Sequence, residues 1–393
     1  MYQDFASPSS RSAAAPAHEA VCRPIAEARG LPNAAYTSHE HWLAERDGLF
    51  ARTWTCIGFA SDLPRGAYAE PVELMGMPLL VLQGADGGIR VFHNVCSHRG
   101  QRLVAGGGPV RGVLRCPYHS WTYDLTGRLR GTPHIGGTGI HRIEGFDCGA
   151  HGLKAIRSAL WMDMIFVNLS GDAPPFEEHI APLAERWQQF WGDAGDRYRR
   201  LGQGDGLDLE IAANWKLAVE NYCESYHLPW VHPGLNTYSK LEDHYNILIA
   251  GRFSGQGTRV YRLPDSADRL PQLDTWPEDR LRTAEYIAMY PNVLLGLHVD
   301  HFFAMRIDPL APDRSREYLR LYYLDDGRPD ASHDAARQAL MDSWRAVFNE
   351  DIAVVEGMQA GRQSPGFDGG LFSPVMDKAN HHFHRWVAEA VSG

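Results

Sequence analysis

The sequence of 393 residues has few cysteines, no long apolar run and no excess of basic residues. Four of its six cysteines are scattered along the chain, which argues against a disulfide framework and favours a reducing, cytoplasmic location. Because no apolar stretch reaches about 18 residues, the sequence predicts no membrane-spanning helix. The formal net charge of −10 argues against nucleic acid or an anionic membrane as a partner. We therefore expect a soluble intracellular protein.

Two sequence signals are also missing. No Gly-x-Gly-x-x-Gly follows a strand and no flavin-binding pattern is found, so we do not expect the chain to take electrons from NAD(P)H directly. The start of the chain lacks the basic residues and apolar core of a secretory signal. Its Ser, Ala and Pro content predicts a mobile tail. We assign residues 1–35 to this tail and a lead-in segment.

The rest of the chain divides into two predicted domains. Short apolar runs punctuated by glycine predict a small all-β domain over residues 36–170, with strands at 78–84, 89–95, 112–118 and 165–171. An amphipathic helix over 38–54 leads into it. Residues 171–393 alternate between predicted helices and strands, which favours an α+β domain. The predicted helices are 176–191, 214–228 and 333–360, and the predicted strands are 244–251, 258–263, 292–307 and 317–324.

The first candidate metal site lies in the small domain, where Cys96-x-His98 is followed by Cys116-x-x-His119. Two cysteines and two histidines suit zinc, but zinc fingers usually place the cysteines in one half and the histidines in the other. Here each half supplies one sulfur and one nitrogen. This arrangement suits a [2Fe–2S] cluster, in which two thiolates hold one iron and two imidazoles hold the other.

The flanks of this motif, NVCSHRG and CPYHSWTYDLTGRL, resemble the Rieske iron–sulfur domain. The resemblance implies that Cys96 and Cys116 bind one iron of a [2Fe–2S] cluster and that His98 and His119 bind the other. It favours the cluster over zinc.

A second candidate site begins in the stretch NWKLAVENYCESYHLPWVH at 214–232. A polar stripe at helical spacing runs through Glu224 and His227 without any Lys or Arg, although a solvated helix face remains the ordinary explanation of such a stripe. On an unbroken helix, His227 and His232 would diverge by about 140°. Pro229 disfavours helix at the residue before it, so a break after His227 would let both imidazoles reach one point.

A carboxylate would complete the facial triad of a non-haem Fe(II) centre, which leaves positions open for O₂. On the predicted helix over 333–360, Asp351 falls on the apolar stripe and Glu350 falls off it. A buried carboxylate is costly unless it is paired or bound to metal. A salt-bridged Asp351 is the alternative, and we prefer the metal ligand.

The order of these motifs resembles the α subunit of Rieske non-haem iron oxygenases from about Leu31 to Trp386. The resemblance implies that His227, His232 and Asp351 bind the mononuclear iron. It implies a small β-sandwich Rieske domain beside a larger catalytic domain, in which helices flank an antiparallel sheet and which includes the segment before the Rieske insertion. It also implies a homotrimer, in which the cluster of one protomer feeds the iron of its neighbour, and an NAD(P)H-dependent reductase with or without a ferredoxin.

One departure from the family suggests the substrate. The acid that connects the two metal sites is Asp in most of the family, and here the matching residue is Glu224. Glutamate at this position is typical of relatives that act on quaternary ammonium compounds, which suggests hydroxylation or N-demethylation beside a cationic nitrogen. Tyr222, Trp230, Phe302 and Phe303 are candidate aromatic walls for such a cation, with core packing as the alternative for each.

Three other functions stay open at this point. An aromatic-ring-hydroxylating dioxygenase or aryl O-demethylase would use the same metal sites with a different pocket. A Rieske electron-transfer protein would need the first site alone, and a zinc-binding regulatory protein would contain no iron.

Overall fold

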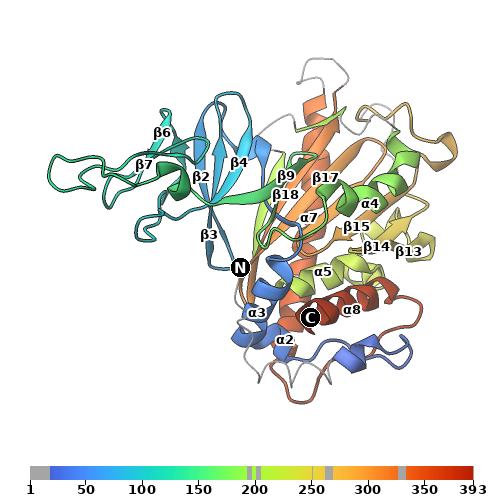
Figure 1. The fold of residues 1–393 in the computed structure, drawn as a ribbon. Coiled ribbons are helices and arrows are strands. Elements are labelled where there is room, and N and C mark those ends of the chain that lie inside the picture. Colours follow the sequence, from blue (N-terminus) through green and yellow to red (C-terminus); the bar gives the residue numbers. More distant parts are fainter. Residues whose placement is uncertain are drawn as a thin grey trace. The chain divides into compact units, whose positions relative to one another are not determined.

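The computed structural model describes residues 18–192, 197–200, 205–249, 251–261, 269–325 and 333–392. It contains two compact units: the smaller spans Trp54–Ala173, and the larger combines the chain up to Thr53 with the chain from Pro174 onward (Figure 1). The predicted boundary at residue 36 differs from this division, because residues 36–53 pack within the larger unit. The predicted boundary at residue 170 lies close to Ala173.

The segment before the smaller unit is folded where it is described. The predicted tail up to residue 17 lies outside the described residues. Beyond it, residues 18–22 are helical, and Val21, Ala28 and Leu31 are buried. The lead-in is therefore folded from residue 18 onward.

The smaller unit is built from antiparallel strands. Its seven-stranded sheet has the order β1-β10-β9-β4-β3-β2-β5, and β6-β7-β8 form a second sheet. The strands are β1 (Thr55–Phe59), β2 (Tyr68–Leu74), β3 (Met77–Gln83), β4 (Ile89–His93), β5 (Gly108–Pro109), β6 (Val113–Arg115), β7 (Thr122–Asp124), β8 (Leu129–Gly131), β9 (Ala155–Trp161) and β10 (Met164–Asn168). The loop between β4 and β5 holds Cys96 and His98, and the loop between β6 and β7 holds Cys116 and His119.

The larger unit is an antiparallel sheet with helices on both faces. The sheet runs β11-β18-β17-β16-β15-β14-β13, with β12 also paired to β18. Its strands are β11 (Tyr198–Arg199), β12 (Gly206–Ile211), β13 (His244–Ile249), β14 (Phe253–Thr258), β15 (Ala284–Met289), β16 (Val293–Leu297), β17 (His301–Ala311) and β18 (Arg314–Leu324). Its helices include α2 (Ala34–Thr37), α3 (His39–Glu45), η1 (Arg46–Phe50), α4 (Phe176–Trp191), α5 (Trp215–Cys223), α6 (Leu228–Val231), α7 (Asp334–Gly361) and α8 (Lys378–Ser392).

Neighbouring residues of β17 show which helix covers which face. The Phe302 ring lies against Trp187 of α4, whereas the next residue, Phe303, contacts Trp344 and Phe348 of α7. Successive side chains of a strand point to opposite faces. Helix α4 therefore covers one face of the sheet and α7 the other. The predicted α+β class with an antiparallel sheet flanked by helices is confirmed.

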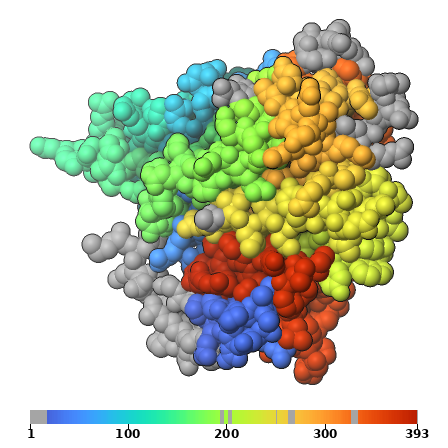
Figure 2. All heavy atoms as spheres, turned by 90° about the vertical axis from the view of Figure 1, so that its right-hand side faces the viewer, coloured from blue at the N-terminus to red at the C-terminus, as the bar shows by residue number. Residues whose placement is uncertain are grey.

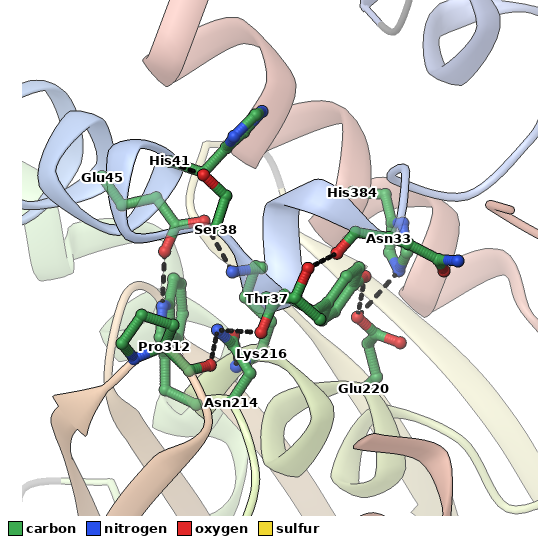
Figure 3. Close-up of polar contacts among 12 residues, drawn as sticks. Asn33, Thr37, Ser38, His41, Glu45, Asn214, Lys216, Glu220, Pro312 and His384 are labelled. Carbon is green, nitrogen blue, oxygen red and sulfur yellow. Dashed lines mark hydrogen bonds and ion pairs between the residues drawn. The ribbon is translucent and has the colours of Figure 1, made fainter. Parts of the chain in front are cut away.

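The N-terminal segment and α8 pack together within the larger unit. In the space-filling view, the C-terminal residues lie between the N-terminal segment and the β13–β14 strands (Figure 2). A buried polar network then joins this segment to α5 (Figure 3). Glu45 accepts a 2.5 Å bond from the fully buried Lys216, and the Tyr36 hydroxyl donates to Glu220 at 2.5 Å. These bonds hold α5 at the start of the second candidate site.

Three sequence predictions are wrong in this unit, and one of them is the single strand predicted at 292–307, which is two strands, β16 and β17. The helix predicted to 228 ends at Cys223, and the strand predicted at 258–263 lies instead at Phe253–Thr258. Strand β14 contains two glycines, which have low strand propensity, so the sequence did not predict it. The structure requires glycine there, because a Cβ on Gly255 would lie 2.0 Å from the Tyr286 carbonyl oxygen. Strands β12 and β15 were also missed. Among the described residues, no helix combines the length and the apolar character that crossing a bilayer requires.

Candidate metal centres

The two ligand loops of the smaller unit repeat one turn. Cys96 N–H donates to the Gln101 carbonyl at 2.8 Å, and Gly100 N–H donates to the Cys96 carbonyl at 3.0 Å. Cys116 makes the same pair of bonds, with Trp121 at 2.8 Å and with Ser120 at 3.0 Å. The fourth residue after each cysteine has positive φ, 70° at Gly100 and 58° at Ser120. The repeated turn gives each cysteine the same local backbone.

The turns bury the two cysteine side chains and leave the two histidine rings more exposed. Cys96 and Cys116 are 2% and 1% exposed, and burial and the contact with the Cys96 thiol raise the pKa of Cys116. The His98 and His119 ring centroids lie 4.7 Å apart, with His98 exposed and His119 half-buried. Among the described residues, the buried His119 Nδ1 has no hydrogen-bond partner. Two adjacent thiols and two adjacent imidazoles, one with a free buried nitrogen, fit a [2Fe–2S] cluster with a different ligand pair on each iron.

Side chains around these loops fix the ligands. The Tyr123 hydroxyl lies 3.2 Å from Cys96 Sγ and also accepts from the Ser97 N–H at 3.1 Å. The Trp121 ring stacks on His98 at 4.6 Å. Hydrogen bonds to the sulfurs of such a cluster influence its reduction potential, so Tyr123 belongs to this site, although no sequence signal singled it out.

In the larger unit, His227 and His232 flank the single turn of α6. Helix α5 ends at Cys223, and Glu224 continues in an extended conformation. The backbone therefore breaks before His227, not after it as predicted. Pro229 lies in the first turn of α6, where its missing N–H is not needed. The two imidazole rings meet with centroids 5.1 Å apart and planes at 71°.

Asp351 on α7 completes this group. Its Oδ1 lies 2.9 Å from His232 Nε2 and 3.8 Å from His227 Nε2. The three ligand atoms lie within 4.8 Å of one another, and they form the one metal-ready group of three found among the described residues. Asp351 Oδ1 is buried and accepts no hydrogen bond of normal geometry there. Two imidazoles and a carboxylate oxygen that converge in this way fit the facial triad of a non-haem iron site.

A second carboxylate lies behind each histidine. Glu224 Oε1 is 2.6 Å from His227 Nδ1, and Glu350 Oε2 is 2.7 Å from His232 Nδ1. Burial lowers the pKa of His232, but the Asp351 and Glu350 carboxylates together raise it above its ordinary value. A carboxylate on Nδ1 fixes the tautomer that turns Nε2 toward a metal. Glu350 falls off the apolar stripe, as predicted, and is exposed, yet it contacts one nitrogen of His232 while Asp351 contacts the other.

The lining of a cavity beside Asp351 can be compared with the four aromatic residues predicted to surround the substrate. Tyr222 lines it, whereas Phe303 lies behind that lining, with its ring 6.5 Å from Tyr222 and 5.8 Å from Phe348. Phe302 is on the opposite face of the sheet, and Trp230 is 71% exposed against Tyr226. These last two predictions differ from the structure. The cavity lining is Ile211, Ala218, Asn221, Tyr222, Leu294, Met305, Glu317, Phe348, Asp351 and Val355.

Comparison with known proteins identifies both domains. The Rieske [2Fe–2S] domain model matches residues 53–152, and the catalytic-domain model of the ring-hydroxylating α subunit matches residues 198–393. The chain is 27% identical over 352 residues to the carnitine monooxygenase oxygenase subunit of Acinetobacter baumannii, covering 86% of each protein. It is 29% identical over 378 residues to the chloroplastic choline monooxygenase of Arabidopsis thaliana, covering 92% of this chain and 82% of that protein.

Solved structures share the fold along nearly the whole chain. A quaternary ammonium Rieske monooxygenase superposes with a TM-score of 0.76 at 23% identity, covering 95% of this chain and 98% of the other. Naphthalene 1,2-dioxygenase superposes with a TM-score of 0.69 at 18% identity, covering 93% and 92%. At these identities the likeness establishes the fold alone. With a Rieske domain and a ring-hydroxylating catalytic domain in one polypeptide, this chain belongs to the Rieske non-haem iron oxygenases, oxidoreductases that pair a [2Fe–2S] cluster with a mononuclear iron.

Proposed function

We propose that the chain is the oxygenase component of a multicomponent system that hydroxylates or N-demethylates a quaternary ammonium compound. Cys96, His98, Cys116 and His119 hold the cluster, and His227, His232 and Asp351 hold the iron. The observation that carries this proposal is the convergence of two Nε2 atoms and one carboxylate oxygen. The Nδ1 atom of each imidazole is hydrogen-bonded to a glutamate.

The residues around the iron have different roles. The metal, when bound, supplies the site at which O₂ is activated. Glu224 and Glu350 accept the Nδ1 protons of His227 and His232, which leaves the Nε2 lone pairs for the metal. Leu294, Phe348 and Val355 give the adjoining cavity apolar walls that exclude water from the reacting atoms.

Electrons come from outside the chain. The sequence has no dinucleotide- or flavin-binding pattern, so a separate NAD(P)H-dependent reductase, with or without a ferredoxin, reduces the cluster. We further propose a homotrimer in which the cluster of one protomer reduces the iron of the next. In that arrangement Glu224, already bonded to His227, also accepts a hydrogen bond from a cluster histidine of the neighbouring protomer.

The substrate class rests on relatives and on one residue. The aligned relatives include carnitine, choline and glycine betaine monooxygenases. Glu224 stands where most of the wider family has Asp, as in the branch that acts on such compounds.

A substrate screen tests this proposal. The iron-loaded protein with a compatible reductase is given carnitine, choline, glycine betaine, naphthalene and a methoxybenzoate, and NADH use, O₂ use and product are measured together. We expect product formation coupled to O₂ use with at least one quaternary ammonium compound. Coupled turnover of naphthalene or the methoxybenzoate alone would assign the chain to aromatic oxidation, and no coupled turnover with any compound would favour electron transfer.

A further inference from the structure

Glu317 is a buried carboxylate in the cavity beside the iron ligand Asp351. It lies on β18 opposite Ile307 of β17, and its side chain is directed to the face covered by α5 and α7, together with Met305. Glu317 is 5% exposed. It therefore lies inside the protein, on the wall of the site where a substrate would meet the metal.

The other buried glutamates of the described residues all have cationic or ionisable partners. Glu45 pairs with Lys216, Glu285 with Arg186, and Glu220 with Arg362 and His384. Glu317 alone among these four has neither a side-chain hydrogen bond nor an ion pair in the part of the chain that is described. An unpaired buried carboxylate is costly, so a protein keeps one where a cation will bind.

The surroundings of Glu317 suit an alkylated cation. The rings of Tyr222 and Phe348 line the same cavity, and aromatic faces attract quaternary ammonium groups. The Asn221 amide also reaches it. The cavity volume of about 20 Å³ has room for about one water molecule, so a larger group enters only when a lining side chain moves. Met305 is the lining residue best able to do so, because its unbranched side chain has three rotatable bonds.

We propose that Glu317 supplies the counter-charge for the cationic group of the substrate and thereby selects quaternary ammonium compounds over neutral ones. The proposal rests on the proposed function and identifies Glu317 as the residue that recognises the positive charge of the substrate. Glu317 acts as a specificity residue: it contacts the cation and takes no part in holding the metal.

A pair of isosteric probes isolates the charge. Choline and 3,3-dimethyl-1-butanol have the same shape, but the second carries carbon in place of the cationic nitrogen. Binding of each to the iron-loaded full chain is measured by calorimetry. We expect the wild type to prefer choline by at least about tenfold, and Glu317→Gln to lose most of that preference by weakening choline binding while leaving the neutral probe unchanged.

Two variants and a stability measurement accompany this test. Glu210→Gln removes the same charge from an exposed position on β12 and should keep the wild-type preference. Glu317→Asp keeps the charge farther from the cavity and should give an intermediate preference. Thermal unfolding should show Glu317→Gln at least as stable as the wild type, since it removes an unpaired buried carboxylate, whereas a structural role would predict a loss of stability.

The outcomes separate this inference from the proposed function. If the wild type binds neither choline, glycine betaine nor carnitine, the proposed substrate class is wrong. If the wild type prefers choline and Glu317→Gln keeps that preference, the role of Glu317 is wrong while the function stands. If Glu317→Gln fails to retain iron, Glu317→Asp decides: a reduced preference supports the role, and an unchanged one overturns it.

Discussion

The two metal sites of this chain are built in different ways. The four proposed cluster ligands lie within residues 96–119, on two loops that repeat the same hydrogen-bonded turn. Of the proposed iron ligands, His227 and His232 flank α6, whereas Asp351 lies in the middle of α7, more than a hundred residues later in the chain. Local backbone geometry therefore defines the cluster site, whereas packing of the larger unit defines the iron site. If this comparison is correct, each site can be removed without the other.

Replacing Cys116 with Ser should have the largest effect on the cluster. A hydroxyl is a poor ligand for a soft iron–sulfur core, so the visible absorbance of the cluster should disappear and turnover should stop. Because the iron site belongs to the other unit, most of the mononuclear iron should remain. A reducible cluster at wild-type intensity in this variant would contradict the ligand assignment.

Asp351→Ala is the reciprocal change. It should abolish turnover and lower the iron content from about three to about two per chain, because the carboxylate completes the mononuclear site while the cluster is untouched. Iron analysis combined with the cluster spectrum checks this. Unchanged iron content would show that Asp351 is a structural carboxylate.

Glu224→Gln tests the connection between the sites. The amide keeps the shape of the side chain but loses its charge, so the variant should retain all its iron and a chemically reducible cluster. We expect it to pass electrons to the iron about 10- to 100-fold more slowly, because Glu224 orients His227 and, in the proposed trimer, connects it to the neighbouring cluster. Cluster reoxidation at the wild-type rate in pre-reduced Glu224→Gln would contradict this role.

Glu350→Gln should have the smallest effect of the four. Glu350 orients His232 as Glu224 orients His227, but its side chain is 44% exposed, against 13% for Glu224. Solvent screens an exposed carboxylate, so we expect iron affinity to fall by about tenfold, the low end of what such partners contribute. Iron titration of the apoprotein measures it, with Glu356→Gln, six residues farther along α7, as the control. A loss as large as that of Asp351→Ala would make Glu350 a ligand.

The same comparison explains what could be predicted from sequence. The cluster ligands could be predicted from a short sequence motif, because they lie on local turns that a few neighbouring residues determine. His227, His232 and Asp351 could be proposed from helical spacing and Pro229, even though the helix breaks four residues earlier than predicted. Glu350 and Glu317 could not be predicted. Glu350 lies off the apolar stripe, and only the structure shows that Glu317 has no partner among the described residues. Trp230 and Phe302 were misassigned because composition alone does not show which face of an element a ring occupies.

We propose that the two metal sites of this chain form a single oxygenase. A single-turnover experiment tests it most directly: the protein is loaded with iron, reduced in the absence of O₂, freed of reductant, and mixed with O₂ with or without carnitine, choline or glycine betaine. We expect the cluster to be reoxidised rapidly only when substrate is bound, and oxygenated product to form in proportion to the iron. Reoxidation at the same rate with and without substrate, and without product, would show that the two sites do not work as one oxygenase.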